Sequence, residues 1–328
     1  MSKPSPILSK MPWNVKQDII NELDYITRFS LRKCSRELRD IIDNSVVVYP
    51  RLHMAVFETS AAHGFVPRVC KPAQLLQHSF SYSPVSEDSC KVGRTKEQNR
   101  KKVNGQNYIE RAVSDMATFL KNPRSSFYSL FMDHPEDILD ELPLILFLTC
   151  LKNTLDMLPH QLSIHRLDIR FSATQEHVLH VLPYLKPGFL TDIFINNKRE
   201  VDQLVNTEQW RMAVNVILIN ESNVRIQDLL HLRRFTIENY QLTPEELPLI
   251  IQAFHTQANK PHYSIGLPQN YNLTPIKTWL NGNETLDAGR HRNTWHMKIQ
   301  GTEFHLEIVL QRTKLRVHRF LSAILGNV

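Results

Sequence analysis

The side chains best suited to bind a metal ion are two histidines on a predicted helix. His177 and His180 lie three residues apart, so both could reach one ion. Neither an HExxH motif nor a carboxylate at ligand spacing accompanies them. The four cysteines lie at least 20 residues apart, and no CxxC or Cys/His spacing occurs. We therefore expect no metal site, no nucleophilic catalytic set and exposed or half-buried histidines.

Glycine content weighs against a nucleotide-using enzyme. Only 9 of the 328 residues are glycine, and they stand far apart, whereas average usage is about 7%. Phosphate loops, nucleophile elbows and dinucleotide fingerprints all need clustered glycine. We therefore expect no cofactor and no enzymatic activity.

The net charge of +6 is unevenly distributed along the chain. Residues 66–124 carry 11 basic and 5 acidic groups, residues 125–289 carry 12 and 19, and residues 290–328 carry 7 and 2. Six basic groups fall between Lys91 and Lys102. This run could serve nuclear import or phosphate contact, or be a solvated loop. No recognition helix, zinc knuckle or aromatic platform accompanies it, so nucleic acid is the less favoured partner.

The overall composition is that of a soluble globular protein. Hydrophobic residues make up 42% and charged residues 22%, and the length suits about two domains. The first residues lack the apolar segment of a secretory signal. The longest apolar run, Leu142–Leu151, has about half the length of a membrane helix. We expect an intracellular protein, cytoplasmic or nuclear, without a membrane span.

The segment Met11–Asp43 predicts two short amphipathic helices. Val15, Ile19, Ile20 and Leu23 form one apolar stripe, and a second runs from Phe29 to Ile42. From periodicity alone, these stripes could pack on the rest of the chain or dock another protein. The phrases MP at Met11, IINELD at Ile19–Asp24 and LRKCSRELR at Leu31–Arg39 resemble an F-box over about residues 8–48.

The resemblance implies binding to the Skp-type adaptor protein of a cullin–RING ubiquitin ligase, and so a role as the substrate-recognition adaptor of a Skp–cullin–F-box ligase. The apolar residues that match the motif would form the adaptor-facing set: Pro12, Ile19, Ile20, Leu23, Leu31, Cys34 and Leu38.

The rest of the chain divides into a connecting segment and a repeat region. We expect an F-box helical motif over residues 1–50, an irregular segment with a basic loop over 51–107 and a repeat domain over 108–328. Helices are predicted at Tyr108–Leu120 and from Asp137 to Lys152. A β-hairpin is predicted at Thr294–Gln300 and Phe304–Leu310, and a capping helix at Lys314–Leu325.

Four copies of an L-x-x-L-x-L pattern alternate with helical stretches at offsets of 26, 24 and 18 residues. The copies begin at Ile164, Leu190, Val214 and Leu232. Such a period predicts an α/β fold, a degenerate leucine-rich-repeat-like solenoid ending in the β-hairpin. Residues 108–320 also resemble the nematode FTH domain, through the phrases DMATFLK (Asp115–Lys121), LPYLKPGFL (Leu182–Leu190), EQWRMA (Glu208–Ala213) and HLRRF (His231–Phe235). That resemblance implies a substrate-binding half without enzymatic activity.

The residues between the pattern positions should face away from the core. They include an apolar cluster with a charged rim, the candidate substrate face: Phe194, Val216, Leu218, Arg234 and Glu238. Residues 51–110 or the hairpin could instead cover this cluster. The hypothesis is an adaptor that holds an unknown protein substrate. The alternative is a ligase-independent binding protein for a regulatory protein or RNA, using the basic insert and tail.

Overall fold

The computed structural model contains two compact units. The first comprises residues 1–165 and 184–186, and the second residues 166–183 and 187–328, so the division falls within strand β7. Each unit is described by itself. No helix in the described part of the chain is long and apolar enough to cross a membrane. The structure describes residues 11–321 except 24, 46–47, 58–59, 66–78, 95–99, 135–140, 198–199, 221–222, 257–260, 284–285, 289–292, 299–303 and 312.

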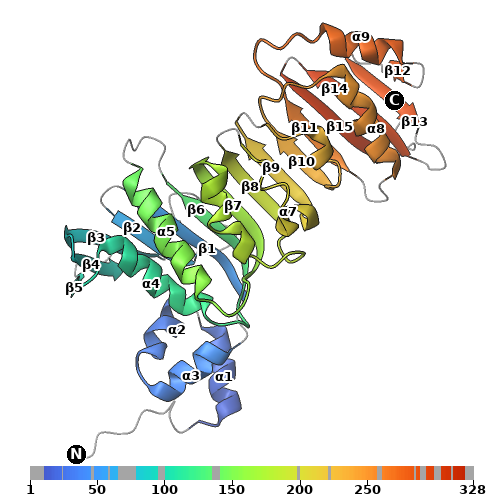
Figure 1. The fold of residues 1–328 in the computed structure, drawn as a ribbon. Helices are drawn as coiled ribbons and strands as arrows, with labels where there is room; N and C mark the ends of the chain where they lie inside the picture. Colours follow the sequence, from blue (N-terminus) through green and yellow to red (C-terminus); the bar gives the residue numbers. More distant parts are fainter. Residues whose placement is uncertain are drawn as a thin grey trace, which may run out of the picture. The chain divides into compact units, whose positions relative to one another are not determined.

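The first unit begins with three short helices and continues into a mixed sheet (Figure 1). The helices are α1 (Trp13–Glu22), α2 (Tyr25–Arg32) and α3 (Arg36–Asn44). The strands are β1 (Val48–Phe57), β2 (Ser60–Phe65), β3 (Ser79–Ser86), β4 (Ser89–Arg94), β5 (Lys101–Asn104) and β6 (Ser126–Asp133). Their order is β6–β1–β2–β3–β4–β5, with β1 parallel to β6 and antiparallel to β2. Helices α4 (Tyr108–Leu120) and α5 (Leu142–Asp156) complete the unit.

The expectation of an irregular segment over residues 51–107 is wrong. Strands β2 to β5 form an antiparallel meander there, and the basic run lies partly on β4 and β5. The sequence of β3, SFSYSPVS, alternates aromatic and small polar residues, so its apolar face is difficult to recognise from the sequence. Pro84 sits where the β3–β4 register shifts, and proline is tolerated at such a bulge. The unit boundary near residue 165 also differs from the expected boundary at residue 107.

The predicted helix at Tyr108–Leu120 is confirmed with the same bounds. Asn107 caps it by accepting hydrogen bonds from the backbone of Ile109 and Glu110, both at 2.9 Å. Its inner face buries Ala112 against Ala61 of β2 and Tyr82 of β3. The 3.6-residue period of its apolar side chains therefore gave both the helix and its buried face.

The second unit alternates parallel strands with short helices and ends in an antiparallel group (Figure 1). The parallel strands are β7 (Ser163–Ala173), β8 (Asp192–Asn197), β9 (Asn215–Ile219), β10 (Arg234–Ile237) and β11 (His262–Gly266). The antiparallel strands are β15 (Lys314–Leu321), β14 (Phe304–Gln311), β13 (Thr294–Lys298) and β12 (Asp287–Ala288), in that order from β11. The helical elements are α6 (Gln175–Leu179), η3 (Leu182–Tyr184), α7 (Glu208–Met212), η4 (Ile226–Asp228), η5 (Pro244–Glu246), α8 (Leu247–Thr256) and α9 (Thr274–Gly282).

The core of this unit lies between one face of the sheet and the helices. Phe254 of α8 packs edge-on against the ring of Tyr263, with the centroids 4.9 Å apart. The strand side chains on this face, the helix-covered face, are at most 1% exposed: Leu167, Ile169, Ile193, Ile195, Val216, Leu218, Phe235, Ile237, Tyr263 and Ile265. We call the opposite face the open face.

The third copy of the pattern was assigned to the wrong alternation. Val214, Ile217 and Ile219 were expected in the core, but they are half-buried, whereas Val216 and Leu218 are fully buried. The strand sequence NVILI is apolar at nearly every position, so alternation alone cannot choose a face. The register chooses it, because Val216 pairs with Ile193 and Phe235 on the helix-covered face. A slip of one residue exchanges the two faces of a strand.

A pair of substitutions checks this correction. Leu218→Ala should lower the free energy of unfolding by about 2–5 kcal/mol, because it leaves a cavity in the core. Ile217→Ala, next to it on the half-exposed face, should cost about 1 kcal/mol. Urea unfolding of the two variants measures the difference. Equal losses would contradict the register.

The expectation of a capping helix at Lys314–Leu325 is also wrong. Residues 314–321 form strand β15, which lies between β14 and β11. Leu315 and Val317 are buried, and the residues that alternate with them, Lys314, Arg316 and His318, are basic. This alternation has the period of a strand. The predicted hairpin of β13 and β14 is confirmed by antiparallel pairing of Thr294 with Val309.

Candidate functional site

The three N-terminal helices enclose a small core. Ile20, Leu38, Ile41 and Ile42 form it, and Leu31 packs against it. Ser35 starts α3 by accepting a hydrogen bond from the Leu38 backbone at 3.1 Å. The buried ammonium group of Lys16 binds Glu37, which ties α1 to α3. A charge that is buried must be paired, so this contact also fixes how the two helices pack.

The seven residues expected to face the adaptor have different environments. Ile20 and Leu38 belong to the core of the helices, with exposed fractions of 0% and 9%. Ile19, Leu23 and Leu31 are half-buried, and Pro12 and Cys34 are exposed. The periodicity identified apolar positions, but it could not separate those that build the motif from those that reach solvent.

Two exposed apolar side chains on α1 were missed as candidates. Trp13 is 52% exposed and Val15 is 37% exposed. Val15 had been counted only as part of the apolar stripe, and Trp13 had no role. Pro12, just before the helix, is exposed as well, and we call these three exposed apolar residues at the start of α1 the α1 surface. The one available signal was Trp13 itself, since a large aromatic residue beside a helix-starting proline is unfavourable in water.

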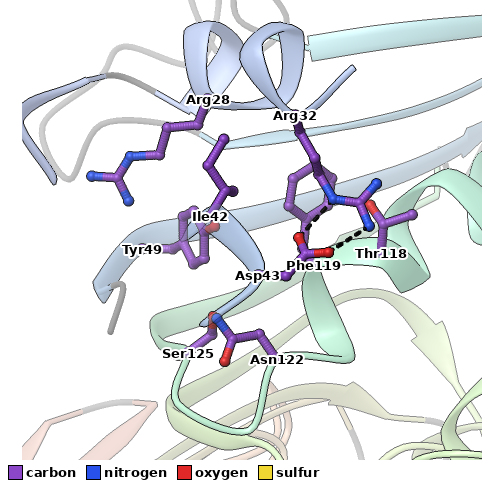
Figure 2. Close-up of a pocket in the computed structure, with 9 residues that line it drawn as sticks. All are labelled: Arg28, Arg32, Ile42, Asp43, Tyr49, Thr118, Phe119, Asn122 and Ser125. Atoms are coloured by element: carbon purple, nitrogen blue, oxygen red, sulfur yellow. Dashed lines mark hydrogen bonds and ion pairs between the residues drawn. The ribbon is translucent and has the colours of Figure 1, made fainter. Parts of the chain in front are cut away.

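Polar contacts around a small pocket join the N-terminal helices to one another and to the segment after α4 (Figure 2). Arg32 forms a two-point ion pair with Asp43, at 2.7 and 2.9 Å. The amide of Asn122 donates to the backbone oxygen of Ser45 at 2.9 Å. These contacts join α2 to α3, and the end of α3 to the segment after α4. The pocket is lined by Arg28, Arg32, Ile42, Asp43, Tyr49, Thr118, Phe119, Asn122 and Ser125.

Aromatic packing strengthens the same junction. Tyr49 stacks on Phe127 of β6 with the ring centroids 5.2 Å apart, and it meets Phe119 of α4 edge-on. Burial raises the pKa of the Tyr49 hydroxyl to about 12, so it stays protonated at neutral pH. A neutral, buried phenol at this place is a structural group, and it keeps the first strand against α4.

Only some residues of the candidate substrate face lie on an exposed surface of the second unit. Val216 and Leu218 are core residues and cannot contact a partner. Phe194 does lie on the open face, but it is only 7% exposed because the guanidinium group of Arg170 covers its ring at 3.9 Å. Arg234 and Glu238 are exposed there, as expected. The predicted apolar cluster is therefore replaced by a largely polar surface.

A buried carboxylate organises one end of the open face. The side chain of Asp168 is 4% exposed and accepts from Arg170 at 2.6 Å and from Arg166 at 3.0 Å. Arg166 also lies opposite Asp192 of β8, so two guanidinium groups and two carboxylates lie together at this end. The arrangement offers no proton donor or acceptor suited to catalysis near pH 7.

His177 and His180 are engaged in local hydrogen bonds. The Nδ1 atom of His177 lies 3.4 Å from the backbone nitrogen of Thr174, and the Nδ1 atom of His180 lies 2.7 Å from the backbone oxygen of Glu176. Within the described residues, no group of three or more metal-binding side chains occurs. These two histidines therefore belong to the turn around α6.

Two family models match the chain. An F-box domain covers residues 8–48, and an FTH domain covers residues 146–278. The chain is also similar to "F-box A protein 224" of Caenorhabditis elegans, with 26% identity over 251 residues. That match covers 72% of this chain and 60% of the relative. Neither family model indicates a catalytic family.

Proposed function

We propose that this chain, which carries an F-box domain and an FTH domain, is the substrate-recognition adaptor of a Skp–cullin–F-box ubiquitin ligase. The N-terminal helices bind a Skp-type adaptor protein, and through it a cullin–RING ligase. The second unit binds a target protein and brings it to the conjugating enzyme. In this role the chain performs no chemistry itself and acts in the cytoplasm or the nucleus.

The observation that carries the proposal is the α1 surface. Val15 exposes apolar area in line with the half-buried Ile19 and Leu23, and Trp13 exposes a second apolar group in the same first turn of α1. Burying one such aliphatic or aromatic side chain in an interface is worth roughly 1.5–3 kcal/mol. A few anchors of this kind, above all tryptophan, dominate the affinity of protein interfaces. These side chains lie within the residues that match the F-box domain, which supports the proposal that a Skp-type protein binds here.

The mounting of the helices supports the same role. Asn122 holds the end of α3 to the segment after α4, Arg32 holds α2 to α3, and Tyr49, which follows α3, stacks on Phe127 in the sheet of the first unit. An adaptor bound to α1 would therefore be held at a defined angle to that sheet. A ligase needs such a fixed mount, because the target must stay within reach of the conjugating enzyme.

For the second unit we propose a degenerate α/β solenoid that presents the target. Five parallel strands joined by short helices support this interpretation. The left-handed backbone of Asn220 and Asn239, each just after a strand, repeats from β9 to β10. The FTH match, residues 146–278, begins in α5 of the first unit and includes all five parallel strands of the second unit.

The alternative of an RNA-binding protein has less support. Lys91 and Lys102 lie directly opposite each other on β4 and β5, and both are exposed. β5 is the edge strand of its sheet. Lysines on an edge strand prevent pairing with other chains, and we assign that role to the basic insert.

Truncation of the α1 surface tests the proposal. Trp13→Ala with Val15→Ala should weaken binding of a purified Skp-type adaptor at least about tenfold, measured by titration calorimetry. Both side chains are exposed, so the variant should unfold at the same urea concentration as the unmodified chain. The matched control is Val85→Ala with Met157→Ala, which removes equally exposed apolar groups elsewhere in the first unit. Unchanged affinity in the first variant would refute the proposed interface.

A further inference from the structure

We infer that the open face of the second unit, over β10, β11 and β15, binds an acidic peptide segment. The patch, which we call the basic patch, consists of Arg234, His262, Lys314, Arg316 and His318. That this peptide belongs to the target of a ubiquitin ligase rests on the proposed function. The argument from charge that the patch binds an acidic peptide does not depend on the proposed function.

The sheet register gathers these residues. Arg234, His262 and His318 stand side by side in one row across β10, β11 and β15. In the next row Thr236, Ser264 and Arg316 lie side by side. In the row after that, Lys314 of β15 pairs with Gly266 of β11. β11 and β15 are neighbours in Figure 1, although 48 residues separate Gly266 from Lys314. The basic C-terminal segment is thus a strand that adds its charges to one face.

The alternation of β15 explains why its charges share a face. Leu315 and Val317 point into the core, with exposed fractions of 0% and 1%. Lys314, Arg316 and His318 therefore point to the open face. Arg234 and His262 do the same, because Phe235 and Tyr263 stack in the core with their centroids 4.2 Å apart.

The cations of the patch lie close enough to act on His262. The pKa of His262 is lowered by burial and then by the positive charges of His318, Arg234, Arg316 and Lys314. His262 is therefore mostly neutral at pH 7, because a further positive charge is unfavourable there. A bound anion would relieve this repulsion, which is the driving force we assign to the site.

Two acidic groups, Glu307 and Glu238, lie near the patch and offset its positive charge only in part. Glu307 is shared between His318 at 2.6 Å and His296 at 3.2 Å. Glu238 follows the end of β10. Among the described residues, no hydrogen bond or ion pair holds the side chains of Arg234, Arg316 or Lys314. These cations can therefore engage a ligand without first breaking a contact.

The dimensions and chemistry favour a peptide over a nucleic acid. Three adjacent strands span about 10 Å, which suits one extended chain. Arginine forks bind carboxylates through two hydrogen bonds. Stacking of bases requires exposed aromatic rings. Among the side chains that the structure describes on this face, the Phe194 ring is covered by Arg170, and Phe, Tyr and Trp are otherwise absent.

Fluorescence anisotropy with the full chain tests the inference. The probe is a labelled peptide of ten glutamates, and a labelled ten-nucleotide oligouridylate is the comparison. Arg234→Glu with Arg316→Glu should weaken binding of the peptide at least about tenfold. The matched control, Arg211→Glu with Lys277→Glu, makes the same charge change on helices α7 and α9 and should bind like the unmodified chain.

Three results would overturn the inference: no binding of the glutamate peptide by the unmodified chain, equal loss in both variants, or tighter binding of the oligonucleotide than of the peptide. Binding of the Skp-type adaptor by the same preparations separates the two proposals. A patch variant that keeps the adaptor but loses the peptide supports the inference. An unmodified chain that keeps the adaptor but ignores the peptide refutes the inference and leaves the proposed function intact.

Discussion

Lowering the pH from 7 to 4 should destabilise the first unit by several kcal/mol, because two buried histidines must accept protons when it unfolds. His53 and His63 are each 2% exposed, and burial lowers the pKa of each to about 4. The unfolded chain has histidine pKa values near 6.5. Below pH 6.5 it therefore binds more protons than the folded chain, and stability falls until about pH 4. A shift of this size corresponds to about 3 kcal/mol per histidine.

The environments of the two histidines suggest where the effect can be removed. Both ring nitrogens of His53 lack a hydrogen-bond partner, and its ring packs against Phe131 with the centroids 5.0 Å apart. His63 instead lies 2.8 Å from the hydroxyl of Tyr82, which donates to Asp115. His53 is thus the site where a titrating ring can be replaced by an apolar one.

Urea unfolding at pH 7.5, 5.5 and 4.5 measures this effect. His53→Phe should remove about half of the loss between pH 7.5 and 4.5, because one of two titrating groups is gone. His255→Phe replaces an exposed histidine of the second unit and is the control. If both variants lose as much stability on acidification as the unmodified chain, His53 is not responsible.

Trp210→Ala should destabilise the second unit by about 3–5 kcal/mol, since it empties the largest fully buried side-chain site. The indole nitrogen donates to the backbone oxygen of Asp228 at 3.1 Å, and this links α7 to η4. Thr207 caps the helix by accepting from the Trp210 backbone at 3.3 Å. The residue therefore joins two consecutive connections between strands.

Thermal unfolding followed by circular dichroism checks this result. Trp210→Phe should lose less stability than Trp210→Ala, because the ring still fills much of the site. It should still lose some, because the Asp228 oxygen no longer has a hydrogen-bond donor. Trp13→Ala removes an exposed tryptophan and is the matched control. A Trp210→Ala chain as stable as the control would show that the site is not packed as described.

Elements with strong local patterns were predictable from the sequence. Helix α4 has both a capping residue and a regular apolar face, and its bounds were found without error. The β13–β14 hairpin was found as well. In β3 serines replace the expected large residues, and in β9 both faces are apolar. The structure of such strands is determined by pairing with neighbouring strands. A local sequence pattern carries no information about that pairing.

The surfaces that we propose as binding sites were predictable only as stretches of chain. The F-box phrases include Pro12 of the α1 surface but not Trp13 or Val15, and the exposure of Trp13 depends on how three helices pack. The basic patch could not be foreseen, because Arg234 and Arg316 meet only through pairing of β10, β11 and β15. Charge counting had placed these residues in separate acidic and basic segments.

The position of β15 sets an order in which the second unit can be assembled. β14 and β15 pair through a tight connection between Gln311 and Lys314, so this pair can form early. Its docking on β11 must close a much longer loop. Until then β11 and β15 each have an unpaired edge, and two chains could pair with each other instead. We therefore expect refolding yield to fall as chain concentration rises, since docking competes with association between molecules.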